Sequence, residues 1–180
     1  MRAILSPTMT GELDGMTVRA LNAADDLVAL TDLLHRAYAE LADMGLRYVA
    51  SHQSVETTAK RIARGECYVA LLEQRIVGTI TLQPPDLASG SAWLDRADVA
   101  VFKQFGVEPA LKRRGIGAAL LDTVEQRALD LGAAEVACDT ADDAAHLIAL
   151  YERRGYRFIE HVDWRPHTNY CSVVLSKRLR

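Results

Sequence analysis

Two glycines open the longest helical pattern in the sequence, directly after a predicted strand. Gly115 and Gly117 lie at the first turn of this helix and follow three cationic residues, Lys112–Arg114. Glycine lets a ligand approach the backbone closely, and the unpaired N–H groups at a helix N-terminus attract anions. The junction between strand and helix therefore predicts a site for a phosphate or a pyrophosphate.

Around this junction the periodicity predicts a single domain that alternates between strands and helices. Its 180 residues are enough to bury roughly 70% of the unfolded surface. Residues 1–15 lack periodicity and are expected to form a flexible extension, which leaves 16–180 as the domain. We expect strands at 17–21, 67–72, 75–82, 98–107, 135–139, 156–162 and 170–176, and helices at 27–41, 54–64, 115–131 and 144–154. The resulting order is βααβββαβαββ.

Composition excludes several classes of protein. Hydrophobic residues make up 49% and charged residues 25% of the chain, which is typical of a globular protein, and a net charge of −3 argues against a nucleic-acid partner. No apolar run approaches the ~18 residues of a membrane span. Three cysteines without metal-ligand spacing favour reduced thiols in the cytoplasm, and the histidines lack the spacing of a metal site.

Two common nucleotide motifs do not fit the glycine segment. A P-loop requires Lys and then Ser or Thr after its last glycine, whereas Ala118 and Ala119 follow Gly117. A dinucleotide fingerprint requires a third glycine where Leu120 stands. Neither an NTPase nor a dinucleotide-binding domain is expected.

The segment Lys112-Arg113-Arg114-Gly115-Ile116-Gly117 instead resembles the [QR]xxGx[GA] signature of the GNAT N-acetyltransferase superfamily, with Lys at the first position. A second segment, Leu150-Tyr151-Glu152-Arg153-Arg154-Gly155-Tyr156, is similar to the LYxxxG[FY] signature of the same family. Two signatures in the right order are far more specific than either alone. The resemblance is strong over 99–160, and the order of elements extends it to 17–178.

This resemblance implies a mixed α/β fold (α+β) with a mostly antiparallel, twisted sheet of about seven strands and helices on both faces. It also implies acetyl-CoA as acyl donor, with the pantetheine arm between the fourth and fifth strands, which splay apart. No metal is implied. At the positions that match the family, the resemblance implies that pantetheine contacts Phe105, Gly106 and Val107. It implies that the pyrophosphate contacts Lys112, Arg113, Arg114, Gly115, Ile116, Gly117 and Ala118.

Tyr151 is the catalytic residue that the resemblance implies. A phenol with an ordinary pKa of ~10 stays protonated at neutral pH and can donate to the sulfur of departing CoA. The alternative is a tyrosine that only packs in the core.

Two further positions depart from the family pattern. Ala144 replaces an Asn that often contacts pantetheine, so that contact is either missing or supplied by Thr140 or Asp142, and Val101 replaces an acidic residue of the fourth strand. No general base can be carried over. The alternatives are a chain of water molecules or one of Glu40, Asp43, Asp98 and His167.

In this family the acceptor is held by the loop between the first two helices and the loop between the last two strands. Tyr48 and Trp164 are the candidate acceptor-binding residues in these loops, and anchoring the loops is the alternative role for both. The leading hypothesis is a transfer of acetyl to a primary amine of a small molecule by direct attack. Protein N-termini or lysines as acceptors, or a non-catalytic acyl-CoA sensor, are the alternatives. Oligomeric state is open, with a homodimer among the options.

Overall fold

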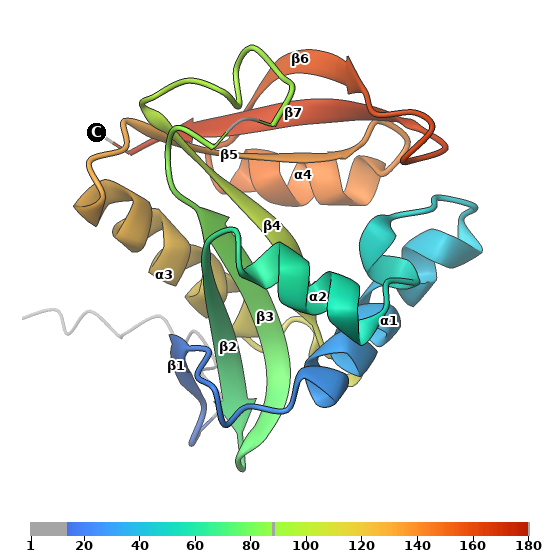
Figure 1. Ribbon diagram of the computed structural model, residues 1–180, viewed down its shortest axis with the longest axis vertical. Coiled ribbons are helices and arrows are strands. Elements are labelled where there is room, and N and C mark those ends of the chain that lie inside the picture. The colour runs from blue at the N-terminus through green and yellow to red at the C-terminus, as the bar shows by residue number, and fades with distance from the viewer. Residues whose placement is uncertain (1–13, 88, 180) are drawn as a thin grey trace, which may run out of the picture.

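The computed structural model describes residues 14–87 and 89–179, so residues 1–13 of the expected extension lie outside the described part. A twisted sheet crosses the molecule with helices on both of its faces (Figure 1). Its strand order is β1-β2-β3-β4-β5-β7-β6, and every neighbouring pair except the parallel β4–β5 pair is antiparallel. The strands are β1 (Thr17–Ala20), β2 (Glu66–Leu72), β3 (Arg75–Gln83), β4 (Val99–Val107), β5 (Glu135–Ala141), β6 (Arg157–Asp163) and β7 (Cys171–Arg178).

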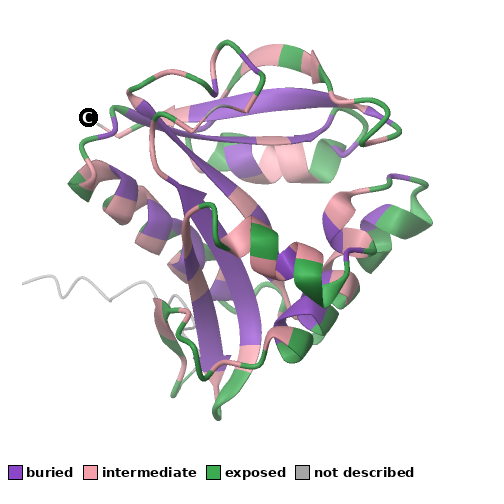
Figure 2. Cartoon of the chain, in the orientation of Figure 1, coloured by how far each residue is buried: buried purple, intermediate pink, exposed green. Residues whose placement is uncertain are grey.

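Four α-helices of the described residues cover the sheet in the predicted order. They are α1 (Leu27–Asp43), α2 (Val55–Ile62), α3 (Ile116–Asp130) and α4 (Ala145–Arg153), with short 3₁₀ turns η1 (Val49–Ser51) and η2 (Pro109–Leu111). The main apolar core lies between the sheet and the pair α3 and α4, while α1 and α2 pack on the other face. The strands of the sheet centre are the most deeply buried part of the chain (Figure 2).

Two side chains cap the turns at the start of α1. The helix is capped by Asp26, whose carboxylate accepts hydrogen bonds from the N–H groups of Val28 and Ala29, at 2.8 and 3.2 Å. Asn22 caps a separate turn, because its side chain accepts from Ala24 N. These caps explain why the helix begins at Leu27.

Strands β4 and β5 pair over three residues only. Val99–Val101 faces Glu135–Ala137, after which β4 continues beside β3 and β5 continues beside β7. The predicted separation of the fourth and fifth strands is therefore present.

A bulge in β4 lies just beyond the point of separation. The register with β3 shifts between Thr79 and Thr81, and Gln104 has a φ of +52°, in the left-handed region. A bulge inserts one extra residue and changes which face the following side chains occupy. Phe102 and Phe105 accordingly both pack toward the α3 side of the sheet, although three positions separate them.

Gly106 lies two residues beyond the bulge at Gln104 and allows a close approach of the backbone. A Cβ atom at Gly106 would lie 3.0 Å from the Cβ of Ala37, so the glycine lets α1 pack tightly against β4.

Gly65 lies between the end of α2 and the start of β2. Its structural role is a close approach rather than a left-handed conformation, because a Cβ atom there would lie 2.1 Å from the carbonyl oxygen of Leu82. A side chain at this position would push β3 away from the end of α2.

We therefore expect Gly65→Ala to lower the free energy of unfolding by at least ~1–3 kcal/mol, the usual cost of overpacking. Urea unfolding followed by circular dichroism measures this. The exposed substitution Arg75→Ala in the β2–β3 turn serves as control and is expected to change stability by less than about 0.5 kcal/mol. Equal stability of the two variants would show that the end of α2 has room to move.

Candidate active site

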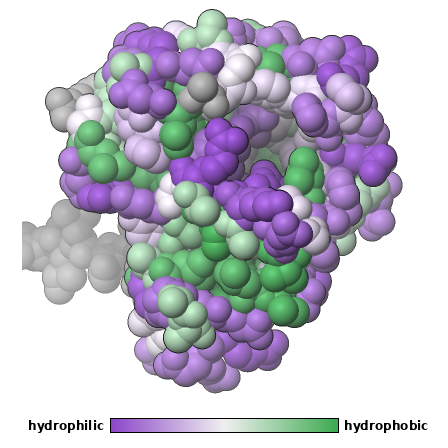
Figure 3. All heavy atoms as spheres, in the orientation of Figure 1, coloured by the Kyte–Doolittle hydropathy of each residue, from purple (hydrophilic) through white to green (hydrophobic). Residues whose placement is uncertain are grey.

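A cavity of about 410 Å³ opens where β4 and β5 separate. Its lining comes from α1, η1, α2, β4, β5, α4 and the β6–β7 loop. The space-filling view shows the molecule hollowed on this face, with hydrophilic side chains around the opening (Figure 3). The lining includes Tyr38, Tyr48, Arg61, Phe102, Lys103, Gln104, Phe105, Asp139, Tyr151, Trp164 and His167.

The N-terminus of α3 has the features of an anion site. Gly115 has a φ of +84° and Arg113 a φ of +62°, so the chain turns sharply before the helix begins. Within the described residues the N–H groups of residues 113–118 have no hydrogen-bond acceptor, and no side chain caps the helix. Free N–H groups and the helix dipole both favour a negatively charged ligand here.

Gly117 faces the end of β4. A Cβ atom at Gly117 would lie 3.2 Å from Cζ of Phe105 and 3.6 Å from Cγ2 of Val107. The cradle between α3 and β4 is therefore open because Gly117 lacks a side chain. These observations fit an anionic group held by residues 113–118.

Among the residues predicted to contact the pyrophosphate, Lys112 already has an acidic partner, Glu40. Its ammonium donates a hydrogen bond of 2.8 Å to Glu40, and this bond lowers the pKa of the Glu40 carboxyl. Both side chains are exposed, and an exposed pair of this kind contributes little stability. Lys112 is therefore paired with α1 but can exchange this partner at little cost.

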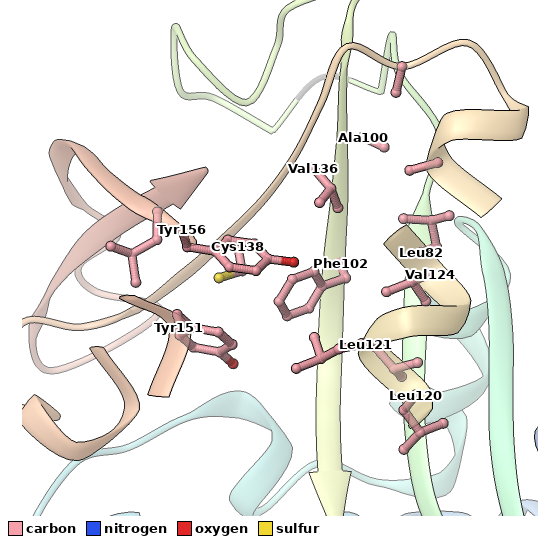
Figure 4. Close-up of a cluster of buried hydrophobic side chains, with 14 of the residues drawn as sticks. Leu82, Ala100, Phe102, Leu120, Leu121, Val124, Val136, Cys138, Tyr151 and Tyr156 are labelled. Atoms are coloured by element: carbon pink, nitrogen blue, oxygen red, sulfur yellow. The ribbon is translucent and has the colours of Figure 1, made fainter. Parts of the chain in front are cut away.

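Tyr151 projects from α4 toward β4. Its ring packs 5.8 Å from the Phe102 ring and 5.7 Å from the Tyr156 ring, between centroids, and only 6% of the residue is exposed (Figure 4). Burial raises the pKa of the Tyr151 phenol well above its ordinary value. The hydroxyl group therefore stays protonated, and no hydrogen bond to another described residue engages it.

The two loops expected to hold the acceptor lie side by side. Asn169, from the β6–β7 loop, donates to the carbonyl oxygen of Gly45 at 2.7 Å and accepts from Arg47 N at 2.8 Å. Tyr48 lines the cavity with its ring, but its hydroxyl accepts from Ala141 N and bonds Thr140 Oγ1, both at 2.8 Å. Tyr48 therefore anchors its loop to β5 as well as lining the cavity.

An ion pair crosses the space between β4 and β5. The ammonium of Lys103 bonds the carboxylate of Asp139, which also accepts from Trp164 Nε1 at 3.0 Å. Burial opposes ionisation of Asp139, but the charge of Lys103 and these hydrogen bonds outweigh it and hold the pKa of Asp139 below its ordinary value. Trp164 thus has an anchoring role in addition to its place in the cavity lining.

The four candidate bases differ in position. Glu40 pairs with Lys112, and Asp98 pairs with Arg96 at the opposite end of β4. Asp43 is an exposed residue at the end of α1 that does not line the cavity. His167 is the one of the four that lines the cavity.

The sequence interpretation missed Arg61, Gln53 and Asp139 as members of this region. Gln53 donates to Gln104 at 2.7 Å and accepts from Arg61 at 2.5 Å, so α2 and β4 are linked by polar side chains. The adjacent polar residues Lys103 and Gln104 in an otherwise apolar strand were the signal for this arrangement.

Within residues 14–87 and 89–179, no group of three or more His, Cys, Asp or Glu side chains is arranged to hold a metal ion. No helix in the same ranges has both the length and the apolar character to cross a membrane.

Residues 27–156 match the family described as the acetyltransferase (GNAT) family. Over 157 residues the chain is 34% identical to the S-(2-succino)cysteine N-acetyltransferase of Bacillus subtilis (strain 168), an alignment that covers 86% of this chain and 92% of that relative. The chain belongs to the GNAT acetyltransferase family.

Solved structures of GNAT proteins share the fold. A GNAT family acetyltransferase from Elizabethkingia anophelis with acetyl-CoA bound aligns with a TM-score of 0.65 at 18% identity, over 92% of this chain and 99% of that one. The ribosomal-protein-S18-alanine N-acetyltransferase from Escherichia coli aligns with a TM-score of 0.69 at 19% identity, over 91% and 94%. These similarities and the family match confirm the predicted GNAT fold, with acetyl-CoA as the acyl donor.

We expect Lys103→Met to lower the free energy of unfolding by about 2–3 kcal/mol, because it leaves the Asp139 carboxylate of this GNAT site without its cation in a mostly buried place. Lys60→Met breaks the exposed pair with Glu56 and should cost less than about 0.5 kcal/mol. Denaturant unfolding compares the two.

The pH dependence of unfolding tests the same pair. The Asp139 pKa is lowered in the folded state, so the pair stabilises the protein above the ordinary Asp pKa of about 4 and this contribution is lost as pH falls through the lower value. Lys103→Met should reduce this acid-linked loss of stability. An unchanged pH profile would show that another carboxylate is responsible for it.

Proposed function

We propose that the protein transfers an acetyl group from acetyl-CoA to the primary amine of a small molecule. The observation that carries this proposal is the position of Tyr151, a protonated phenol in the lining of the cavity that begins at the separation of β4 and β5. The free N–H groups at α3 would hold the phosphates of the donor at the adjacent end of β4. One cavity then brings together a donor site and an acid.

The residues suggest a direct transfer. Bound acetyl-CoA supplies the thioester. The nitrogen of a neutral amine attacks the thioester carbonyl, a C–N bond forms and the C–S bond breaks, and the Tyr151 hydroxyl donates a proton to the departing sulfur. The amine loses its own proton to water or to His167, the candidate base that lines the cavity.

A small acceptor is favoured over a protein because several elements enclose the cavity. Tyr38, Tyr48 and Tyr170 pack ring against ring in its lining, and its volume of about 410 Å³ lies in the range of small-molecule sites. The 34% identical relative is named for the acetylation of S-(2-succino)cysteine, a small amine. We further propose that the protein acts in the cytoplasm, since its three cysteines are unpaired thiols.

Release of free CoA over a panel of small amines, protein N-terminal peptides and lysine peptides tests this function. Turnover with small amines and not with peptides is expected. Preferential turnover of peptides would point to a protein acetyltransferase. Tight acetyl-CoA binding without release above background for any amine would point to a sensor.

Gly117→Val tests the donor site. A valine side chain would fill the cradle beside Phe105 and should weaken acetyl-CoA binding by at least about 10-fold, measured by calorimetry on the folded variant. Gln126→Val, on the exposed side of the same helix, is the control for a β-branched residue in α3. Equal affinity in both variants would place the phosphates elsewhere.

Tyr151→Phe separates binding from chemistry. The ring and its packing on Phe102 are kept while the proton donor is lost, so kcat should fall by ~10²–10⁴-fold with little change in acetyl-CoA affinity. Because burial raises the Tyr151 pKa well above 10, the wild-type rate should show no loss from phenol ionisation below about pH 10. Full kcat in the variant, with chemistry rate-limiting, would exclude Tyr151 as the acid.

A further inference from the structure

Three side chains form a continuous polar chain from α2 to the bulge of β4. Arg61 Nη1 donates to Gln53 Oε1 at 2.5 Å, and Gln53 Nε2 donates to Gln104 Oε1 at 2.7 Å and to Thr58 Oγ1 at 2.7 Å. His35 holds the same segment, since its ring nitrogen lies 2.8 Å from the carbonyl oxygen of Gln53. Arg61 and Gln104, the two ends of this chain, both line the cavity.

The cation fixes the orientation of both amides. Arg61 can only donate, so Gln53 must turn its oxygen toward Arg61 and its nitrogen toward Gln104. Gln104 must then turn its side-chain oxygen toward Gln53, so the side-chain nitrogen of Gln104 takes no part in this chain of hydrogen bonds. Gln104 is only 4% exposed, and within residues 14–87 and 89–179 its Nε2 has no hydrogen-bond partner. An unpaired buried donor of this kind is costly unless a ligand accepts its hydrogen bond.

Arg61 also has no directly bonded counter-charge among the described residues, although Asp139 is close enough to act on its charge. Within the described residues no carboxylate forms an ion pair with it, whereas Lys103, Arg127 and Arg157 each have an acidic partner. Burial lowers the pKa of Arg61, which reflects the cost of placing its charge in this environment. An anionic ligand would offset that cost.

The groups at this end of the cavity therefore present donors and positive charge. A guanidinium and an amide N–H match a carboxylate, which is planar, negatively charged and an acceptor only. They do not match the ammonium end of an amine, which needs acceptors. The attacking amine must instead lie toward Tyr151, which projects into the same cavity from α4.

We propose that Arg61 and Gln104 bind a carboxylate of the acetyl acceptor, so that the acceptor is a small amine that also carries a carboxylate, as an amino acid does. This inference rests on the proposed function, because it assigns the acceptor part of the same cavity. Arg61 and Gln104 are specificity-determining residues, and Gln53 is a positioning residue that sets the direction of their hydrogen bonds.

Matched acceptors provide the test. L-aspartate, L-glutamate, L-methionine and S-carboxymethyl-L-cysteine are each compared with derivatives in which one carboxylate is converted to the carboxamide, and CoA release is measured. Wild-type protein should prefer at least one carboxylate over its carboxamide by about 10- to 100-fold in kcat/KM, the usual value of a hydrogen bond to a charged group.

The variant Gln104→Glu keeps the oxygen that Gln53 needs and replaces the free donor with a second oxygen. Arg61→Gln removes the cation. Each should raise KM for the preferred acid by about 10-fold or more, change the carboxamide much less, and leave acetyl-CoA affinity intact. Arg75→Gln, in the exposed β2–β3 turn, is the matched control and should behave as wild type.

Calorimetric titration of the four acids and their carboxamides in the presence of CoA separates this proposal from the proposed function. Carboxylate-dependent binding that both variants abolish, without CoA release from any amine, would support the carboxylate site and overturn the transferase function. Turnover of amines with no preference for a carboxylate, or equal losses for acid and carboxamide in both variants, would overturn the carboxylate site and leave the transferase function standing.

Discussion

The separation of β4 from β5 is the constraint on which the rest of the site depends. Parallel pairing stops after Val101 and Ala137, although each strand continues beside its other neighbour. In the described part of the chain, the edge of β4 that faces β5 beyond this point has no strand beside it, and backbone groups left there need other partners. Phe102 and Tyr151 close the space on the side of α3 and α4, and the Lys103–Asp139 pair crosses it on the side of α1 and α2. The cavity between these two layers is the consequence.

The bulge at Gln104 determines what the cavity presents. A regular strand would alternate its side chains between the two faces, whereas the extra residue allows the neighbours Lys103 and Gln104 to make contacts with Asp139 and Gln53. A non-glycine residue at positive φ costs of order 1–3 kcal/mol, and the hydrogen bond from Gln53 and the packing of Phe105 hold Gln104 in that conformation. Strain, polarity and the loss of pairing thus coincide in a few residues of β4.

Local patterns predicted the parts of the site that depend on neighbouring residues in the chain. The helix start at Gly115–Gly117 and the position of Tyr151 on an amphipathic helix were visible as spacing and residue type. Arg61 and Gln53 were not, because their roles depend on how the α1–α2 segment folds over β4, which no local period encodes. The pairing of Lys112 with Glu40 was missed for the same reason, since these residues meet only when α1 lies beside the start of α3.

The charges around the cavity matter for catalysis because β4 lacks the acidic residue that the family often has in its fourth strand. Asp139 is neutralised by Lys103, so the charge of Arg61 is not cancelled within the described part of the lining. A carboxylate of the acceptor bound to Arg61 would offset this charge, so Arg61 fixes the position of the acceptor and does not itself deprotonate the amine. The proton of the amine must then pass to another group at the cavity, either water or the imidazole of His167, because Val101 occupies the place of the acid. Selection of the acceptor and removal of its proton are thereby assigned to different ends of the cavity.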